Sequence, residues 1–371
     1  MENLVLYRKY RPQTFGNIIG QEHVTKTIAN EIKSGQAAHA YLFSGPRGCG
    51  KTTTARVIAK AVNCLNRKKD EAEPCGECAN CLEIQSGRAI DLVEIDAASH
   101  RGIDDIRELR EGIKFSPNKL KYKVFIIDEC HQLSKDAANA LLKTLEEPPA
   151  HAIFILATTE LHKILPTILS RCQRFDFRKL SLPELAGRLQ KLADNEKIKI
   201  EKAALELVAL TAGGSVRDAE SLLGQVITAG GKKKTEIAAQ DVRDLLGISE
   251  TKSIGEFVEF LAKKDAAGAI SHLNDVAQRG YDIAEYGKSV LNYLRQALIL
   301  AIINPKTAQN DNFMITGLTN EEFEILRTQT TTMGEPTIKK AIEIFLDAQG
   351  KIKYSPIPQL PLEIAIVESC E

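Results

Sequence analysis

Tryptophan is absent from this 371-residue sequence, and aromatic residues make up only 5% of it, so neither a base-stacking platform nor an aromatic belt is indicated. No hydrophobic run approaches the roughly 20 residues needed to cross a bilayer. The formal net charge is zero, which argues against a surface coated with positive charge for indiscriminate nucleic-acid binding. The first residues show no secretory pattern, and we therefore expect a cytoplasmic protein.

Charge and cysteine are both unevenly distributed along the chain. The first 60 residues hold nine lysines and arginines against three glutamates, a bias that suits a phosphate site. Of the eight cysteines, four cluster in residues 64–81. In a cytosolic protein such a cluster is more often metal-binding than disulfide-bonded.

The hydrophobic pattern divides the chain into an α/β part and a helical part. Expected strands are 40–45, 89–96, 123–128, 152–158 and 174–177. Apolar strands that alternate with helices indicate a parallel sheet covered on both faces. From residue 181 onward only helical periodicity remains. We expect an α/β nucleotide-binding domain at 1–180, a small helical domain at 181–247 and a third, helical domain at 248–371.

One helical stretch in the third domain is unusually apolar. Leu291, Leu294, Leu298 and Ile302 share a face of it. Two explanations stay open, burial within its own helical bundle and burial against another subunit.

A phosphate-binding loop is indicated between the first strand and the next helix. Residues 45–52 read GPRGCGKT and fit the pattern G-x-x-x-x-G-K-[ST]. Glycines let successive backbone N–H groups point at phosphate oxygens, and the following helix adds its positive end. Lys51 would bridge the β- and γ-phosphates, and the Thr52 hydroxyl would bind Mg²⁺. Such strings also occur by chance, but the strand–loop–helix context argues against chance.

Two adjacent carboxylates end another apolar strand, in the run KVFIIDECHQLS. Asp128 is placed to hold Mg²⁺, and Glu129 is placed to polarise an attacking water. The alternative is a solvated turn after a buried strand. Together with the phosphate loop, the pair favours a nucleoside triphosphatase.

Three further side chains are candidates for sensing the nucleotide. Thr158 ends the following strand, where a hydroxyl can sense a γ-phosphate. Arg171 closes a short helix, either as an ordinary C-terminal charge or as an arginine finger for a neighbouring subunit. Arg217 lies in a first helical turn, where it either pairs locally with Asp218 or Glu220 or points back at the phosphates.

The cysteine cluster predicts a closed metal site. Cys64, Cys75, Cys78 and Cys81 have loop lengths that suit tetrahedral zinc. No histidine falls inside the cluster, so no position is left for a catalytic water and the site is expected to be structural. An iron–sulfur cluster also accepts four thiolates and stays as the alternative.

These motifs together resemble the gamma/tau subunits of bacterial DNA polymerase III, the AAA+ ATPases of the sliding-clamp loader. The resemblance runs from LYRKYRPQTFGNIIGQEHV to QLPLEIAIVE and includes GPRGCGKT, IDECHQLS, NALLKTLEEPP, ATTELHKILPTILSRC and GSVRDA. The cysteine insert after the phosphate-loop helix is a signature of that family. The resemblance implies an AAA+ P-loop α/β domain, a helical lid and an all-α collar that joins subunits into a hetero-pentamer.

By position, the resemblance also implies roles for single residues. Thr158 falls in the first sensor, Arg171 is the finger that acts on a neighbouring subunit, and Arg217 is the lid sensor. With Lys51, Asp128 and Glu129 they form the expected catalytic group. The residues expected around the nucleotide are Tyr7, Arg8, Arg11, Pro12, Ile18 and Ile19 at the adenine and ribose, and Gly45, Pro46, Arg47, Gly48, Cys49, Gly50, Lys51, Thr52, Thr53 and Arg217 at the phosphates.

The implied activity is ATP hydrolysis within the DNA polymerase III holoenzyme, with ATP, Mg²⁺ and structural Zn²⁺ bound and without a polymerase active site in this chain. ATP would open the clamp, and hydrolysis would release it on primer-template DNA, which is contacted without sequence specificity. Relatives often continue into a helicase- and polymerase-binding tail, whose activities are not assigned here.

Three competing interpretations are disfavoured. A Holliday-junction-type motor is expected to lack the cysteine insert, and a non-hydrolysing scaffold to have lost Lys51 or the acidic pair. A zinc-dependent DNA-binding regulator is expected to carry more positive charge and a second metal knuckle.

Overall fold

The computed structural model describes residues 5–68, 70–99, 111–113, 115–230, 236–246, 251–302 and 320–371. The chain divides into two compact units, Met1–Glu236 and Ile237–Glu371. The expected division into three domains stays a prediction, and its second boundary, at 247/248, lies outside the described residues.

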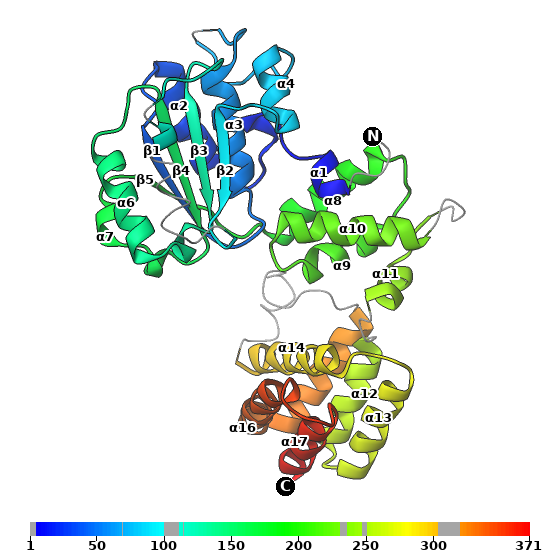
Figure 1. The fold of residues 1–371 in the computed structure, drawn as a ribbon. Coiled ribbons are helices and arrows are strands. Elements are labelled where there is room, and N and C mark those ends of the chain that lie inside the picture. Colours follow the sequence, from blue (N-terminus) through cyan, green and yellow to red (C-terminus); the bar gives the residue numbers. More distant parts are fainter. Residues whose placement is uncertain are drawn as a thin grey trace. The chain divides into compact units, whose positions relative to one another are not determined.

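A five-stranded parallel sheet forms the centre of the first unit (Figure 1). Its order is β2-β3-β4-β1-β5, and neighbouring strands pair in parallel throughout. The strands are β1 Ala40–Ser44, β2 Leu92–Asp96, β3 Lys123–Asp128, β4 Ala152–Thr158 and β5 Gln173–Asp176. The α/β fold expected from the sequence is confirmed.

Helices cover both faces of this sheet. Phe43 of β1 packs in one core with Ile58, while the next residue back, Leu42, packs in the other core with Leu141. This alternation follows from the strand period of two, and it lets one strand contribute to both hydrophobic layers. The helical elements before residue 170 are α1 Leu6–Lys9, η1 Phe15–Asn17, α2 Glu22–Ser34, α3 Lys51–Asn63, α4 Ala79–Ser86, η2 Cys130–Gln132, α6 Lys135–Glu146, η3 Leu161–Lys163 and α7 Pro166–Leu169.

The second strand begins at Leu92, three residues later than the hydrophobic pattern indicated. Asp91 is almost fully buried, and its carboxylate accepts hydrogen bonds from the backbone N–H groups of Asn118, Lys119 and Leu120 at 2.8, 2.8 and 2.9 Å. The preceding residues therefore turn to present this carboxylate to a distant loop instead of extending the strand.

A small helical layer follows the sheet within the first unit. It consists of α8 Leu182–Asn195, α9 Lys202–Thr211 and α10 Val216–Gly230. The helix α8 starts with Pro183 in its first turn, and Glu184 accepts a hydrogen bond from the Ser181 N–H at 2.8 Å. The N-terminal helix α1 also packs on α10, so the first residues of the chain belong to this layer.

The described part of the second unit is helical. Its helices are α11 Ala239–Leu246, α12 Thr251–Ala262, α13 Ala266–Gln278, α14 Ile283–Ile302, α16 Asn320–Ile352 and α17 Leu360–Cys370. Within α16, Gly334 leaves the helical conformation at φ 71° and ψ 157°, so this range consists of two helical segments on either side of a kink. No helix among the described residues is both long and apolar enough to span a membrane.

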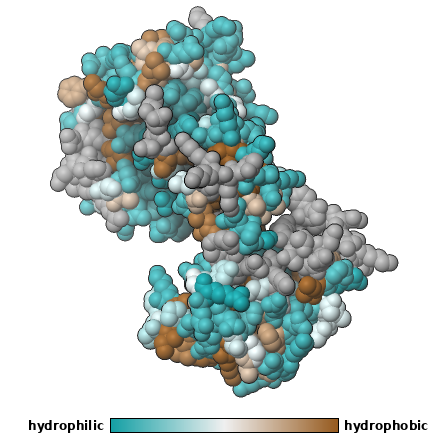
Figure 2. All heavy atoms as spheres, turned by 90° about the vertical axis from the view of Figure 1, so that its right-hand side faces the viewer, coloured by the Kyte–Doolittle hydropathy of each residue, from teal (hydrophilic) through white to brown (hydrophobic). Residues whose placement is uncertain are grey.

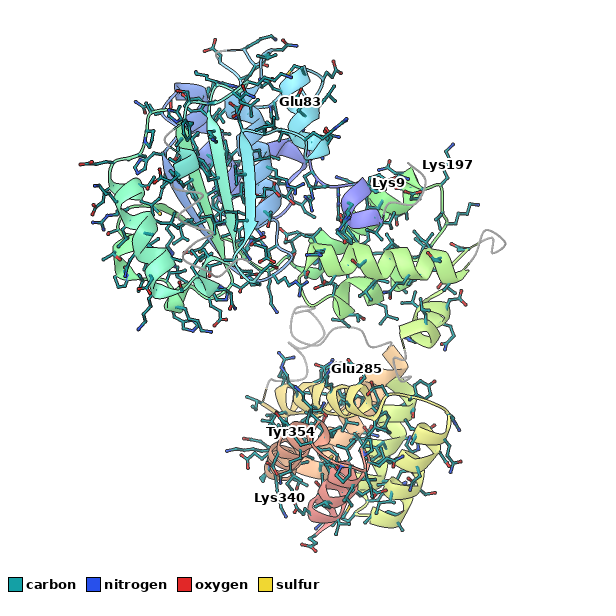
Figure 3. All side chains as sticks on the ribbon, in the orientation of Figure 1. Lys9, Glu83, Lys197, Glu285, Lys340 and Tyr354 are labelled. Carbon is teal, nitrogen blue, oxygen red and sulfur yellow. The ribbon has the colours of Figure 1, made fainter. Side chains whose placement is uncertain are left out.

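The apolar face of α14 is divided between core and surface. Leu294 is fully buried in the core of the second unit, Leu291 and Leu298 pack partly against it, and Ile302 is 65% exposed. Elsewhere in this unit Tyr354 is 82% exposed; its side chain is labelled in Figure 3. On the face drawn in Figure 2, hydrophilic side chains predominate over the described surface and hydrophobic ones occur as scattered patches.

Candidate nucleotide and metal sites

The sheet order brings three expected functional segments to one edge. β4 lies between β1 and β3, so Thr158 at its end separates the loop after β1 from the acidic pair after β3. Ligands of open parallel sheets bind at this carboxyl edge. The juxtaposition is a property of the topology, because the three segments are far apart in sequence.

The loop after β1 has a backbone that glycine alone adopts readily. Gly45 and Gly48 have φ values of 142° and 76°. A Cβ at Gly48 would lie 2.0 Å from the Ser215 hydroxyl oxygen, so this glycine also permits close approach of the helical layer. Lys51, which is 5% exposed, donates hydrogen bonds to the carbonyls of Gly45 and Pro46 at 2.6 and 2.9 Å.

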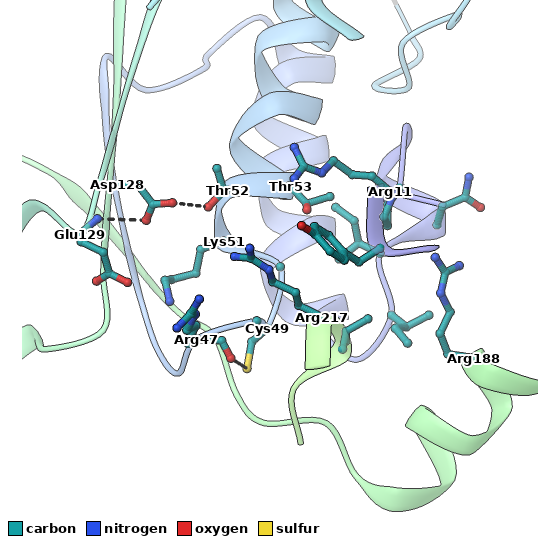
Figure 4. Close-up of a pocket in the computed structure, with 18 of the residues that line it drawn as sticks. Arg11, Arg47, Cys49, Lys51, Thr52, Thr53, Asp128, Glu129, Arg188 and Arg217 are labelled. Carbon is teal, nitrogen blue, oxygen red and sulfur yellow. Dashed lines mark hydrogen bonds between the residues drawn. The ribbon is translucent and has the colours of Figure 1, made fainter. Parts of the chain in front are cut away.

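A cavity of about 420 Å³ opens beside this loop, within the usual range for a small-molecule site (Figure 4). The expected nucleotide contacts that line it are Tyr7, Arg11, Pro12, Ile18, Ile19, Arg47, Gly48, Cys49, Gly50, Lys51, Thr52, Thr53 and Arg217. Arg8, Gly45 and Pro46 are not among its lining residues. Lining residues that the sequence did not single out for this site are Asn17, Asp96, Ala98, Arg188 and Val216.

The acidic pair lies in the same cavity. The Thr52 hydroxyl donates a hydrogen bond to Asp128 Oδ2 at 2.7 Å, which brings together the two side chains expected to hold Mg²⁺ (Figure 4). Glu129 has a φ of 48°, an uncommon conformation for a side-chain-bearing residue and one typical of functional sites. Burial lowers the pKa of Lys51, and the carboxylates of Glu129 and Asp128 offset part of that effect.

His131 connects the acidic pair to the end of β4, a role that the sequence did not indicate. Its Nδ1 lies 3.0 Å from Thr158 Oγ1 and 3.4 Å from Glu129 Oε2. Its Nε2 lies 3.3 Å from Glu160 Oε1, and its side chain is only 3% exposed. Glu129 also accepts a hydrogen bond from the Thr159 hydroxyl at 2.8 Å. Thr158 itself is not among the residues that line the cavity.

The helical layer closes the cavity from the other side. The Gly48 carbonyl accepts hydrogen bonds from the backbone N–H groups of Val216 and Arg217 at 3.1 and 3.4 Å. The Arg217 guanidinium lies 4.9 Å from the centre of the Tyr7 ring, and this contact lowers the pKa of the Tyr7 hydroxyl. Glu220 pairs with Arg188 at 2.9 Å. Arg217 therefore lines the cavity, and its action on the phosphates stays a prediction.

The Arg171 side chain binds residues outside the nucleotide cavity. It follows α7, donates to the Thr167 carbonyl at 2.7 Å and pairs with Glu146 at the end of α6. It is not among the residues that line the cavity of its own chain.

The four clustered cysteines converge after α3. Their Sγ atoms all lie within 4.8 Å of one another, and those of Cys64 and Cys78 are 4.0 Å apart. A regular tetrahedron with zinc–sulfur bonds of about 2.3 Å requires sulfur atoms about 3.8 Å apart, so the four thiols fit zinc. Burial opposes ionisation of Cys78, but N–H donors from Cys81 and Leu65 outweigh it and lower the pKa of its thiol to about 6.

Three family models match consecutive parts of the chain. They are "DNA polymerase III, delta subunit" over residues 20–181, "DNA polymerase III clamp loader subunit, ATPase lid domain" over 184–232, and "DNA polymerase III subunits gamma and tau domain III" over 237–371. DNA polymerase III subunit gamma of Buchnera aphidicola is 36% identical over 369 residues, which cover 95% of this chain and 98% of that protein. The chain belongs to the DNA polymerase III gamma/tau family.

Longer relatives of the gamma/tau family match over the same region. DNA polymerase III subunit tau of Bacillus subtilis is 42% identical and that of Escherichia coli 37%, each over 100% of this chain. The chain spans 64% and 55% of the length of these two relatives. Among solved structures, the RuvB branch migration motor of Thermotoga maritima matches with a TM-score of 0.49 at 20% identity, covering 74% of this chain and 86% of that one. The family assignment depends on the sequence matches.

Proposed function

We propose that this chain is the ATP-hydrolysing subunit of a bacterial sliding-clamp loader and acts in the cytoplasm during DNA replication. One observation carries the proposal. In a gamma/tau family member, the phosphate loop, the acidic pair and a lid arginine line one cavity of about 420 Å³. A chain that had kept the fold only as a scaffold would not need to retain all three groups.

In this proposal the phosphates of ATP lie along the loop that ends at Lys51. The Lys51 ammonium, which donates to two loop carbonyls in the structure, would turn to the β- and γ-phosphates. Thr52 and Asp128 would hold Mg²⁺, which neutralises phosphate charge when bound. Glu129 would orient the attacking water. The hydrogen bond between Thr52 and Asp128 supports this assignment, since both oxygens already point at one place.

The three sensing residues receive different roles. Arg217 would report on the nucleotide from the lid, an assignment supported by its place in the cavity wall. Thr158 would act through His131 and Glu129. Arg171 would reach the nucleotide of a neighbouring subunit, and its absence from its own cavity supports that role.

ATP would act mainly as a conformational switch. The lid meets the phosphate loop at the Gly48 carbonyl, so a nucleotide held by both parts would favour one lid arrangement. ATP shifts this equilibrium only by the difference between its affinities for the two arrangements. The lid position would in turn decide whether the loader grips and opens the clamp.

The proposed partners are the other loader subunits, the sliding clamp and primer-template DNA contacted through its phosphates. We propose three domains, at 1–180, 181–247 and 248–371, with the third joining subunits in a hetero-pentamer. An apolar face on α17 supports this role, because Leu360, Ile364 and Val367 are 40%, 51% and 43% exposed. Zinc is proposed as the structural ion of the four thiols.

The test is ATP hydrolysis by the chain assembled with its loader partners, with and without clamp plus primed DNA. Wild type is compared with Arg171→Ala and with Arg174→Ala. Arg174 is a nearby exposed arginine that pairs with Asp176, two residues further along the chain. We expect clamp and DNA to stimulate turnover, and Arg171→Ala alone to abolish the stimulation while ATP binding is kept. Turnover that ignores clamp and DNA would overturn the loader function.

A further inference from the structure

The cysteine insert contacts the segment that precedes three cavity-lining residues, Asn17, Ile18 and Ile19, through one carboxylate. Glu73 accepts hydrogen bonds from the backbone N–H of Phe15 to Oε2 and from that of Gly16 to Oε1, both at 2.8 Å. These are two N–H groups at the start of η1, whose donors are not used by the short helix itself. Both hydrogen bonds are charge-assisted, because each is accepted by a carboxylate oxygen, and both join residues more than 50 positions apart in the sequence.

The segment held by Glu73 leads into part of the cavity wall. Directly after Phe15 and Gly16 come Asn17, Ile18 and Ile19, and all three line the cavity. The family resemblance places the base and ribose of the nucleotide at Ile18 and Ile19, and the phosphates at residues 45–52. Displacement of η1 would therefore change how the base is held without touching the phosphate loop.

A second contact holds the same segment from α3. Lys60, only 2% exposed, donates to Gln13 Oε1 at 2.8 Å. Four residues later the helix gives way to Cys64, the first thiol of the cluster. The loop that carries Glu73 starts at Cys64 and returns at Cys75, so both of its ends are cluster thiols.

We propose that the cysteine insert positions the base side of the nucleotide cavity, with Glu73 as the positioning residue that transmits the effect. An ion shared by Cys64 and Cys75 closes the intervening loop and fixes the Glu73 carboxylate on η1. Phe15 and Ile18 are also buried in the hydrophobic core, so loss of Glu73 loosens the segment and does not unfold it. The inference depends on the proposed function in one respect, that the cavity takes ATP.

The first experiment compares Glu73→Ala and Glu73→Gln with Glu71→Ala in the full chain. Glu71 lies in the same loop, and its carboxylate pairs with the exposed Lys68. We expect both Glu73 variants to keep their zinc and to raise the Kd for ATP by about three- to tenfold. The Kd for Mg²⁺-tripolyphosphate, which has no base, is expected to stay unchanged. Hydrogen–deuterium exchange is expected to accelerate at the Phe15 and Gly16 amides, which donate to Glu73.

The second experiment removes the metal from wild type and from Glu73→Ala by chelation. If the insert acts through Glu73, chelation weakens ATP binding in wild type and adds little in the variant, because both changes break the same link. The inference is overturned if Glu73→Ala has wild-type exchange and ATP affinity, or if ATP and tripolyphosphate affinities fall together. If wild type itself binds no ATP, the proposed function fails instead.

Discussion

Arg188 is expected to be essential for the stability of the first unit. Its Nε donates to Glu220 Oε1 at 2.9 Å, and one terminal nitrogen donates to the Tyr10 carbonyl at 2.7 Å. The side chains of Arg188 and Glu220 are 15% and 4% exposed. One guanidinium thus ties α8, α10 and the N-terminal segment together. Replacement by Met keeps an unbranched apolar stem in place of the aliphatic part of Arg188 and removes every donor.

The expected loss of stability in Arg188→Met follows from the Glu220 carboxylate, which stays buried without its partner. Burial raises the pKa of Glu220, and Arg188 offsets part of the rise. Removing one partner of a buried pair costs about 3–5 kcal/mol, because the other charge stays buried without compensation. For a unit of this size 1 kcal/mol shifts Tm by about 2–4 °C, so Arg188→Met is expected to lower Tm by about 6–20 °C.

The loss of stability in Arg188→Met is also expected to depend on pH. The folded-state pKa of Glu220 is raised above its ordinary value of 4.5, and loss of Arg188 raises it further. The folded variant then binds this proton more tightly than the unfolded chain does. Its stability falls as pH rises from about 4.5 through the folded pKa, and levels off above it. The deficit relative to wild type is therefore smallest near pH 5 and largest near pH 8.

The assay is thermal and urea unfolding at both pH values, without nucleotide. Arg178→Met is the control, since its pair with Glu184 is 48% and 29% exposed and is expected to contribute under about 1 kcal/mol. Glu220→Leu in the Arg188→Met background should recover most of the loss, because an apolar pair replaces a buried ion pair at little cost. A loss below about 1 kcal/mol, or no recovery in the double variant, would refute the reasoning.

Three further predictions concern the site and its support. His131→Ala is expected to lower kcat about 10- to 100-fold with little change in Kd for ATP, because it releases the link between the acidic pair and β4; an equal loss in His162→Ala, whose side chain is 75% exposed, would contradict this. Cys81→Ser should abolish stoichiometric zinc in metal analysis, and retained zinc would show that three thiols suffice. Asp91→Ala leaves three backbone N–H groups unpaired and should cost about 3 kcal/mol in urea unfolding; an unchanged midpoint would refute it.

Much of the fold could be predicted because its signals are local. The strand β3, for example, coincides with the apolar run at 123–128 that predicted it. The start of β2 could not be predicted, because it depends on the buried contact of Asp91 with a loop about 27 residues away. Burial along α14 was likewise undecided, since an apolar stripe does not say which of its members another helix covers.

The sequence by itself determined the chemistry at single positions: a glycine-rich loop ending in Lys51, two carboxylates after an apolar strand, and four thiols at short spacing. Each of these depends on neighbours along the chain, where residue type and spacing carry the information. Only the tertiary structure decided which groups meet. His131 bridges two strand ends, Arg188 binds a residue 32 positions away, and Glu73 grips η1 across 58 positions, because packing of the sheet and its helices sets those distances.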